Sequence, residues 1–173
     1  MTDTEWTEPV DLVDGDVSDV DAFNAQVNGN LRHLHYAKAG TFGLTGAVVI
    51  PNETFVSLEW NFAELETVSL WSASPYPERI TPSVGGLWLF TVRVQWPPTG
   101  GGAVSVRMQQ QGVVTVGQDT RVGSTFTTYS TFSSIVEIDG AGDYVNFHAW
   151  QSTGNDVTIN GGHRLDCVYL GAV

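Results

Sequence analysis

The sequence predicts an all-β protein, an antiparallel jelly-roll sandwich preceded by an extended N-terminal arm and one short α-helix. Three observations support this prediction. From residue 46 onward, short apolar runs alternate with Pro, Gly, Asn and Asp. Only residues 18–38 repeat apolar side chains at helical spacing, and the first 21 residues contain eight carboxylates and no Lys or Arg. We therefore divide the chain into an acidic docking arm (1–17), an amphipathic helix (18–40) and a head domain (41–173).

The head domain contains about eight to ten runs with the composition of strands. They are residues 47–50, 54–62, 65–71, 86–96, 103–109, 113–116, 125–138, 143–151, 157–160 and 165–170. In the clearest run, Trp88, Phe90, Val92, Val94 and Trp96 alternate with Leu87, Leu89, Thr91, Arg93 and Gln95. We expect the first set to face the core and the second to face outward. The absence of repeats and of helical crossovers favours a two-sheet jelly roll over a propeller or an α/β fold.

A Gly-rich connection separates two of the longest runs. Residues 138–143 read Ile-Asp-Gly-Ala-Gly-Asp. The run that follows alternates Val145, Phe147 and Ala149 with Tyr144, Asn146, His148 and Trp150. This pattern predicts a β-hairpin between the two runs.

Residues 18–38 are predicted to form the helix. Ser18 is suited to cap its N-terminus, and Asp21 places a carboxylate in the first turn, where the helix dipole favours negative charge. Apolar side chains then form one stripe: Val20, Phe23, Val27, Leu31 and Leu34. A single helix of this length is marginal in water, so the stripe must pack against the head or against copies of itself. Asn30 either sets the register between such helices or is exposed.

The arm before this helix is polar and acidic, and its bulky residues are few: Trp6, Pro9, Val10, Leu12 and Val13. They cannot form a core alone. The arm is therefore either a solvated tail or an extended peptide that binds a groove on another protein. For the docking alternative, the predicted contact residues come from the arm and the helix stripe: Trp6, Val10, Leu12, Val13, Phe23, Val27, Leu31 and Leu34.

The charge of the chain excludes some classes of partner. With 7 basic and 19 acidic residues, the net charge is -12, so counterion release from a phosphate backbone cannot supply affinity and nucleic acid is not expected as a partner. No apolar stretch reaches the length that a bilayer requires, and the N-terminus is acidic, so we expect no membrane insertion and synthesis in a cytoplasm. The single Cys167 excludes an internal disulfide and is expected to be a buried thiol rather than a reactive one.

The head is expected to form an oligomer. Residues 54–173 contain 15 aromatic and 15 charged side chains, with no Lys among them. Protein interfaces are depleted in Lys and enriched in aromatic residues and Arg, whereas a monomeric sandwich exposes more charge. The predicted subunit-contact residues are Leu87, Leu89, Tyr144, His148, Trp150 and Tyr169. The alternative is one large monomer core with a few exposed aromatic side chains.

No pattern in the sequence predicts catalysis, a cofactor or a metal site. Asp14, Asp16 and Ser18 resemble the start of a calcium loop, but Asp19 stands where that loop needs Gly. His148 and His163 could pair with nearby carboxylates, yet no nucleophile motif accompanies them. Four aromatic residues could either stack on sugar rings or pack in an interface: Trp71, Tyr76, Tyr144 and Trp150.

Two stretches of the head resemble a known family. Residues 86–94 read Gly-Leu-Trp-Leu-Phe-Thr-Val-Arg-Val, and residues 136–147 include Gly-Asp-Tyr-Val. Together they are similar to the strand pair of trimeric jelly rolls of the tumour necrosis factor and complement globular-head type, over residues 55–173. This resemblance implies a homotrimer that associates through aromatic faces. The last strand departs from the family pattern, because residues 165–171 lack its Phe-x-Gly motif.

The leader resembles the openings of virion structural proteins of tailed bacteriophages over residues 5–36. The resemblance rests on Trp6, Pro9, residues 15–18, Phe23-Asn24, Val27, Asn30-Leu31 and Leu34. It implies a virion protein, assembled in the host cytoplasm, whose N-terminus docks on capsid or tail proteins and whose trimeric head projects outward. The alternative is a tail-fibre tip module that binds a host receptor or a host-surface glycan. An enzyme ranks third among these hypotheses.

Overall fold

The computed structural model describes residues 38–140 and 142–173 as one compact unit, the head. The predicted arm, the predicted helix up to residue 37 and all eight predicted docking residues lie outside the described residues. Those expectations therefore stay predictions. Within the described part of the chain, no helix is long and apolar enough to cross a bilayer.

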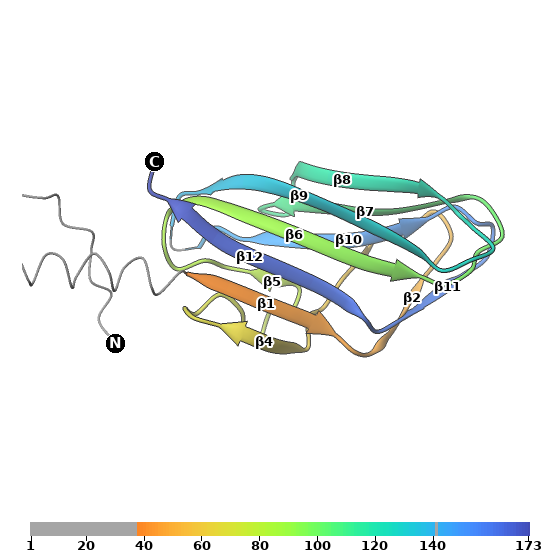
Figure 1. Ribbon diagram of the computed structural model, residues 1–173, viewed down its shortest axis with the longest axis horizontal. Helices are drawn as coiled ribbons and strands as arrows, with labels where there is room; N and C mark the ends of the chain where they lie inside the picture. The colour runs from red at the N-terminus through yellow and green to blue at the C-terminus, as the bar shows by residue number, and fades with distance from the viewer. Residues whose placement is uncertain (1–37, 141) are drawn as a thin grey trace, which may run out of the picture. The chain divides into compact units, whose positions relative to one another are not determined.

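The head is built from antiparallel strands, which confirms the predicted fold class. The strands are β1 (Ala39–Leu44), β2 (Ala47–Ile50), β3 (Val56–Ser57), β4 (Phe62–Glu66), β5 (Arg79–Ile80), β6 (Gly86–Trp96), β7 (Ala103–Gln110), β8 (Val114–Val122), β9 (Thr128–Ile138), β10 (Val145–Gln151), β11 (Val157–Asn160) and β12 (His163–Gly171). One sheet has the order β4-β1-β12-β6-β9 and forms the front of Figure 1. The other has the order β3-β10-β7-β8, with β5 also paired to β10, and β11 pairs with β2.

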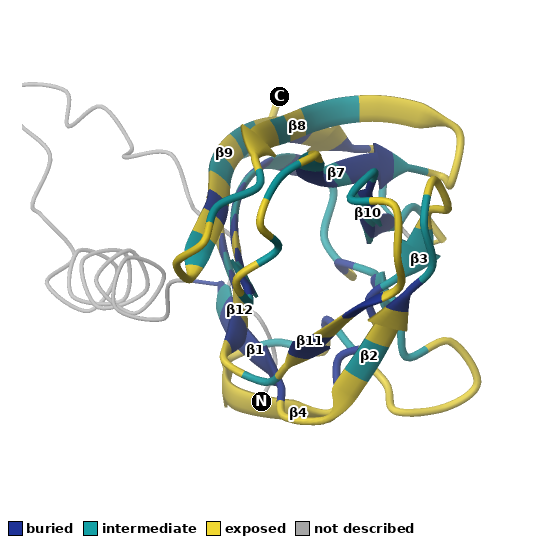
Figure 2. Cartoon of the chain, turned by 90° about the vertical axis from the view of Figure 1, so that its right-hand side faces the viewer, coloured by how far each residue is buried: buried dark blue, intermediate teal, exposed yellow. Residues whose placement is uncertain are grey.

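The two sheets enclose a single hydrophobic core (Figure 2). The alternation predicted for residues 86–96 is confirmed, because Trp88, Phe90, Val92, Val94 and Trp96 are all buried. From the opposite sheet, β10 contributes buried side chains in the same way, and the Phe147 ring meets the Trp60 ring edge-on at 5.7 Å between centroids. Burial of these large apolar side chains stabilises the sandwich and fixes which face of each strand points outward.

The predicted boundaries were wrong at the start of the head. β1 begins at Ala39, so it includes the last two residues of the predicted helical segment, and these residues pair with Val168 and Cys167 of β12. The run predicted for residues 65–71 is displaced, since the strand there is β4, which pairs with β1. These short strands have weak alternation, and tertiary pairing selects them rather than local propensity.

The predicted hairpin between residues 138 and 143 was also wrong. β9 pairs with β6 in one sheet, and β10 pairs with β7, β3 and β5 in the other. The connection therefore crosses between the sheets. Gly140 and Gly142 adopt φ values of 122° and 106°, which glycine allows without steric cost. The Gly-rich turn was identified correctly. The strands on either side of it do not pair with each other, because they cover the same core from opposite sides.

Candidate functional site

The outward face of the β4-β1-β12-β6-β9 sheet carries an uncommon number of apolar side chains at one end. Val168 of β12 lies opposite Leu89 of β6, and Leu89 lies opposite Ile135 of β9. Leu87 and Leu170 extend this row toward the C-terminal end of β12. We refer to Leu87, Leu89, Ile135, Val168 and Leu170 as the apolar strip. Ile135, Val168 and Leu170 are exposed, and the two β6 leucines are half-buried.

The centre of the same face is polar and internally bonded. Thr41 donates a hydrogen bond of 2.7 Å from its Oγ1 to Asp166 Oδ1, and the hydroxyls of Thr91 and Ser133 are 2.8 Å apart. Arg164 Nε donates to both oxygens of Asp166 at 3.0 and 2.9 Å. The bonded Asp166 carboxylate raises the pKa of Arg164. This ladder gives the face a fixed pattern of charge beside the apolar strip.

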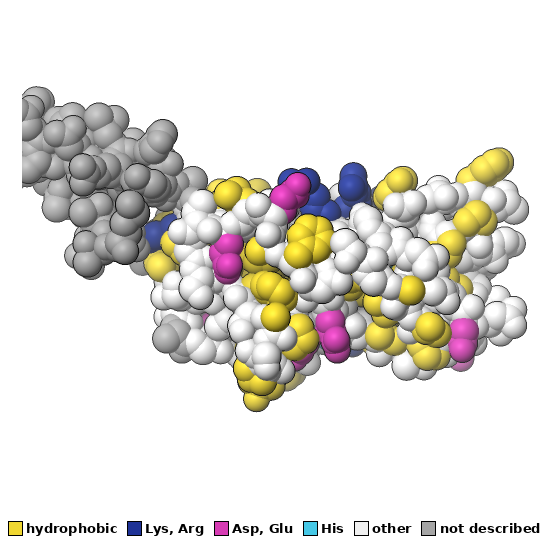
Figure 3. All heavy atoms as spheres, turned by 90° about the horizontal axis from the view of Figure 1, so that it is seen from below, with side chains coloured by type: hydrophobic (Ala, Val, Ile, Leu, Met, Phe, Trp, Pro, Cys, Tyr) yellow, Lys and Arg dark blue, Asp and Glu magenta, His cyan; other side chains and the backbone are white. Residues whose placement is uncertain are grey.

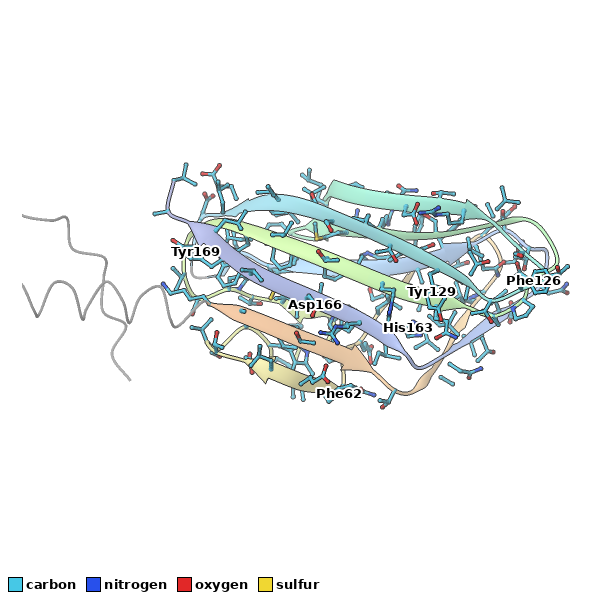
Figure 4. The ribbon with its side chains drawn as sticks, viewed as in Figure 1. Phe62, Phe126, Tyr129, His163, Asp166 and Tyr169 are labelled. Atoms are coloured by element: carbon cyan, nitrogen blue, oxygen red, sulfur yellow. The ribbon has the colours of Figure 1, made fainter. Side chains whose placement is uncertain are left out.

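Two exposed aromatic side chains lie elsewhere on this face. Figure 4 shows Phe62 on β4 and Tyr129 on β9, and both are exposed. The Phe62 ring lies against Gly43 of β1, where a Cβ atom would collide with it. Arg93 stacks over the Tyr129 ring with 5.7 Å between the guanidinium carbon and the ring centroid. The surface seen from below in Figure 3 likewise shows many hydrophobic side chains and few charged ones.

The structure does not bring the predicted subunit-contact residues together. Leu87 and Leu89 belong to the apolar strip, but Tyr144, His148 and Trp150 are on or beside β10 in the other sheet. The predicted adjacency of these two groups was therefore wrong, because β6 and β10 are in different sheets. Tyr169, at the end of β12 (Figure 4), packs edge-on against Trp88 with 5.3 Å between the ring centroids. The role of these six residues in subunit contact stays a prediction.

The group on the second sheet forms its own aromatic surface. The guanidinium carbon of Arg107 lies 3.4 Å from the centroid of the Phe55 ring, which lies 6.0 Å from the Trp150 ring. His148 is opposite Arg107 in the β10–β7 ladder. Partial burial and the positive charge of Arg107 lower the pKa of His148. At neutral pH the imidazole is therefore neutral beside the arginine.

Two further titratable side chains are buried away from solvent. His163 accepts a hydrogen bond at Nδ1 from the Gln95 backbone N–H at 3.2 Å, and burial lowers its pKa to about 4. Burial also raises the pKa of the Cys167 thiol to about 12, so the thiol stays protonated and unreactive. The predicted buried thiol is confirmed. Among the described residues, no carboxylate forms a hydrogen bond or an ion pair with His163 or His148, so the structure shows no acid–base pair there.

A cleft of about 340 Å³ lies where residues 69–83 fold over the sandwich. Trp71, Tyr76 and Arg79 line it, together with several serine side chains. Thus the structure places two of the four candidate sugar-stacking residues, Trp71 and Tyr76, at one site. A third, Tyr144, lies just before β10 and contacts Arg79, whereas Trp150 lies on the aromatic surface around Phe55.

No protein-family model matches the chain, and a search of curated proteins finds no match. Solved structures do match. Eiger TNF from S. frugiperda superposes with a TM-score of 0.57 at 13% identity, over 79% of this chain and 94% of that chain. The globular domain of zebrafish complement 1qA protein gives a TM-score of 0.62 at 9% identity, over 79% and 99% of the two chains. The head has the jelly-roll fold of the tumour necrosis factor and complement globular-head type.

The same jelly roll also matches a phage protein. The PRD1 vertex protein P5 superposes with a TM-score of 0.59 at 14% identity, over 77% of this chain and 96% of that chain. At such identities the likeness concerns the fold alone. The resemblance expected from residues 86–94 and 136–147 is therefore confirmed at the level of fold.

Sequence reasoning missed most of the apolar strip. Ile135, Val168 and Leu170 were not predicted as contact residues, although all three are outward apolar residues whose chain neighbours are less exposed. The signal was present in the strand pattern, because the outward positions near these residues are apolar where an exposed face would usually carry polar side chains. Without the strand order, however, these positions could not be recognised as neighbours of Leu87 and Leu89.

Proposed function

We propose that this chain is a non-enzymatic surface component of a phage virion, a homotrimer whose jelly-roll head projects from a docking site bound by residues 1–37. The observation that carries the proposal is the apolar strip on the outward face of the β4-β1-β12-β6-β9 sheet. The family that the head resembles implies three copies, and the likeness to a phage vertex protein supports a virion. The resemblance of the leader to phage virion proteins points the same way.

The apolar strip is suited to contact between copies of the chain. Its five side chains come from three adjacent strands and remain accessible in the single chain, so association would remove them from water at about 25 cal/mol per Å². Large exposed apolar patches rimmed by polar groups mark interaction sites. The neighbouring ladder of Arg164, Asp166 and Thr41 supplies such a rim.

The position of the strip also fits an N-terminal anchor. β1 enters the head at Ala39, which pairs with Val168 of the strip. In a closed trimer built on this strip, the three chains would therefore enter at the subunit contact, close to one another. Three leaders starting from one end could dock together, which raises their combined affinity for an assembly.

Sedimentation of the full chain tests the trimer. At micromolar concentration we expect a mass three times that of the 18.7 kDa chain. Ile135→Asp places a charge in the strip and is expected to weaken association at least about tenfold. Val114→Asp is the matched control, since Val114 is a β-branched residue of β8 in the other sheet with 58% exposure against 59% for Ile135. A monomeric wild type, or equal behaviour of the two variants, would contradict the proposal.

One observation favours a second candidate function, recognition of a host-surface saccharide. The cleft formed by residues 69–83 gathers aromatic and polar side chains at one place on the head, and Tyr76 among them is exposed. The two functions are compatible, because a virion surface protein can also bind a host. They differ in their experiments, since trimer formation depends on the apolar strip and saccharide binding depends on the cleft.

A further inference from the structure

We infer that the cleft beside Trp71, Tyr76 and Arg79 binds a neutral saccharide, with the apolar face of a pyranose ring stacked on Tyr76 and its hydroxyls bonded by Arg79 and Glu78. The inference rests on the second candidate function above and names its site. All the residues come from one chain, so the site is complete in each subunit.

The walls of the cleft are held in place by hydrogen bonds. Glu66 accepts from the backbone N–H groups of Leu70 and Trp71 at 2.6 and 2.9 Å. The indole Nε1 of Trp71 donates to the Pro77 carbonyl at 2.9 Å, across the loop. A site fixed before the ligand arrives binds more tightly, because little conformational entropy remains to be lost.

The hydrogen bond of the Trp71 indole determines what that side chain can offer. Its one donor is already used within the loop, and its ring is tilted against Phe42 with 6.2 Å between centroids. Trp71 therefore presents apolar ring surface to the cleft. Arg79 lies over one face of the Tyr76 ring, and Tyr76 is 52% exposed, so the opposite face of the ring can accept a stacked ligand.

The Arg79 guanidinium lies over the rings of two tyrosines. Its guanidinium carbon lies 3.8 Å from the Tyr76 centroid and 4.2 Å from the Tyr144 centroid. Stacking leaves the N–H groups in the guanidinium plane free to donate sideways. Glu78 adjoins the cleft through Arg79, which lines it: Glu78 Oε1 lies 3.3 Å from Arg79 Nε, so a donor group and an acceptor group stand side by side at the edge of the cleft. Adjacent hydroxyls of a sugar, each both donor and acceptor, match this pair.

Local charge favours a neutral ligand over an acidic one. Arg79 is the one basic side chain that lines the described cleft, while Glu66 and Glu78 adjoin it and Asp143 follows the lining residue Gly142. A carboxylated or sulfated sugar would meet these carboxylates at short range. The volume of about 340 Å³ suits one or two sugar rings rather than a long peptide.

Binding can be measured with the full-length protein on an array of neutral, sialylated and sulfated oligosaccharides, followed by calorimetry with the neutral sugar retained best. Tyr76→Ala is expected to lower affinity at least tenfold, and Tyr76→Phe to change it less than threefold, because the ring carries the stacking. Phe126→Ala is the matched control, an exposed aromatic residue outside the cleft lining, and is expected to bind like wild type.

Several outcomes would overturn the inference. They are no retained neutral oligosaccharide, retention of acidic sugars alone, equal binding by Tyr76→Ala and wild type, or binding of a proline-rich peptide in place of any sugar. Sedimentation of the Tyr76→Ala variant separates the two proposals. A trimer that fails to bind sugar counts against the cleft only, and a monomer that binds sugar counts against the trimer only.

Discussion

At the scale of single residues, burial sets the chemistry of this head more strongly than charge pairing does. His163 is 3% exposed and is neutral at physiological pH, since burial penalises its charged form. Its Nε2 has no hydrogen-bond partner among residues 38–140 and 142–173. A protonated His163 would therefore place an uncompensated charge in the sandwich, next to the Gln95 backbone.

This gives the head an acid sensitivity of predictable sign. Because the pKa of His163 falls from 6.5 to about 4 on folding, the unfolded chain binds a proton first as the pH drops. Stability is thus fully present above pH 6.5 and decreases between pH 6.5 and about 4, by on the order of 3 kcal/mol. Urea unfolding across this range should show a weaker pH dependence for His163→Asn, whose amide oxygen can still accept from Gln95. Parallel pH profiles of wild type and variant would contradict the prediction.

At the scale of elements, the sandwich is closed where the edge strands β8 and β9 of its two sheets meet. The Phe132 ring of β9 lies against Gly117 of β8, in space that a Cβ atom would fill. Ser134 Oγ donates to the Val116 carbonyl at 2.6 Å, and the Thr131 N–H donates to Asp119 at 3.0 Å. These contacts cover two sheet edges that could otherwise pair with other chains.

Gly117→Ala tests this closure. The added methyl group would displace the Phe132 ring, and overpacking of this kind costs about 1–3 kcal/mol of unfolding free energy. Gly46→Ala is the control, because the nearest atom to its new Cβ, Asn61 Nδ2, is 3.9 Å away, and a change below about 0.5 kcal/mol is expected. Urea unfolding at one fixed protein concentration compares the two, and equal midpoints would refute the role given to Gly117.

The element scale also shows the limit of sequence reasoning. The bounds of β2, β6 and β11 were predicted correctly, since their alternation is strong and glycine or proline lies near their ends. β1 and β5 were missed, because short strands with weak alternation form only where a partner strand lies beside them. The candidate site was affected in the same way, as Leu87 and Leu89 were identified while their neighbours on β9 and β12 were not.

At the scale of the whole molecule, anchoring and presentation fall to different parts of the chain in the proposed function. In the proposed function, the apolar strip would join the copies, the cleft on each head would meet the host, and the acidic leader would bind the particle. Each part can then be disabled separately, which a single multifunctional surface would not allow.

The leader is tested in the full chain by replacing Trp6, Leu12 and Val13 with Ser together. We expect the trimer to persist and binding to particles prepared without this protein to fall at least tenfold, because the large apolar contacts of the arm are lost. Replacing Thr2, Thr4 and Thr7 with Ser makes the same number of changes in the same segment and should leave binding intact. Cosedimentation with the particles measures both, and undiminished binding of the first variant would exclude the arm as the anchor.

The amino-acid sequence by itself determined the all-β class, the core-facing sides of the longest strands and the buried Cys167, because alternation of apolar residues is a local property with a period of two. Only the tertiary structure decided that β9 and β10 lie in different sheets and that the apolar strip runs across β12, β6 and β9. It also brought Trp71 and Tyr76 to one cleft, with Arg79 over the rings of Tyr76 and Tyr144. These arrangements depend on which strands pair across long stretches of sequence, and pairing is decided by the shared core rather than by neighbouring residues.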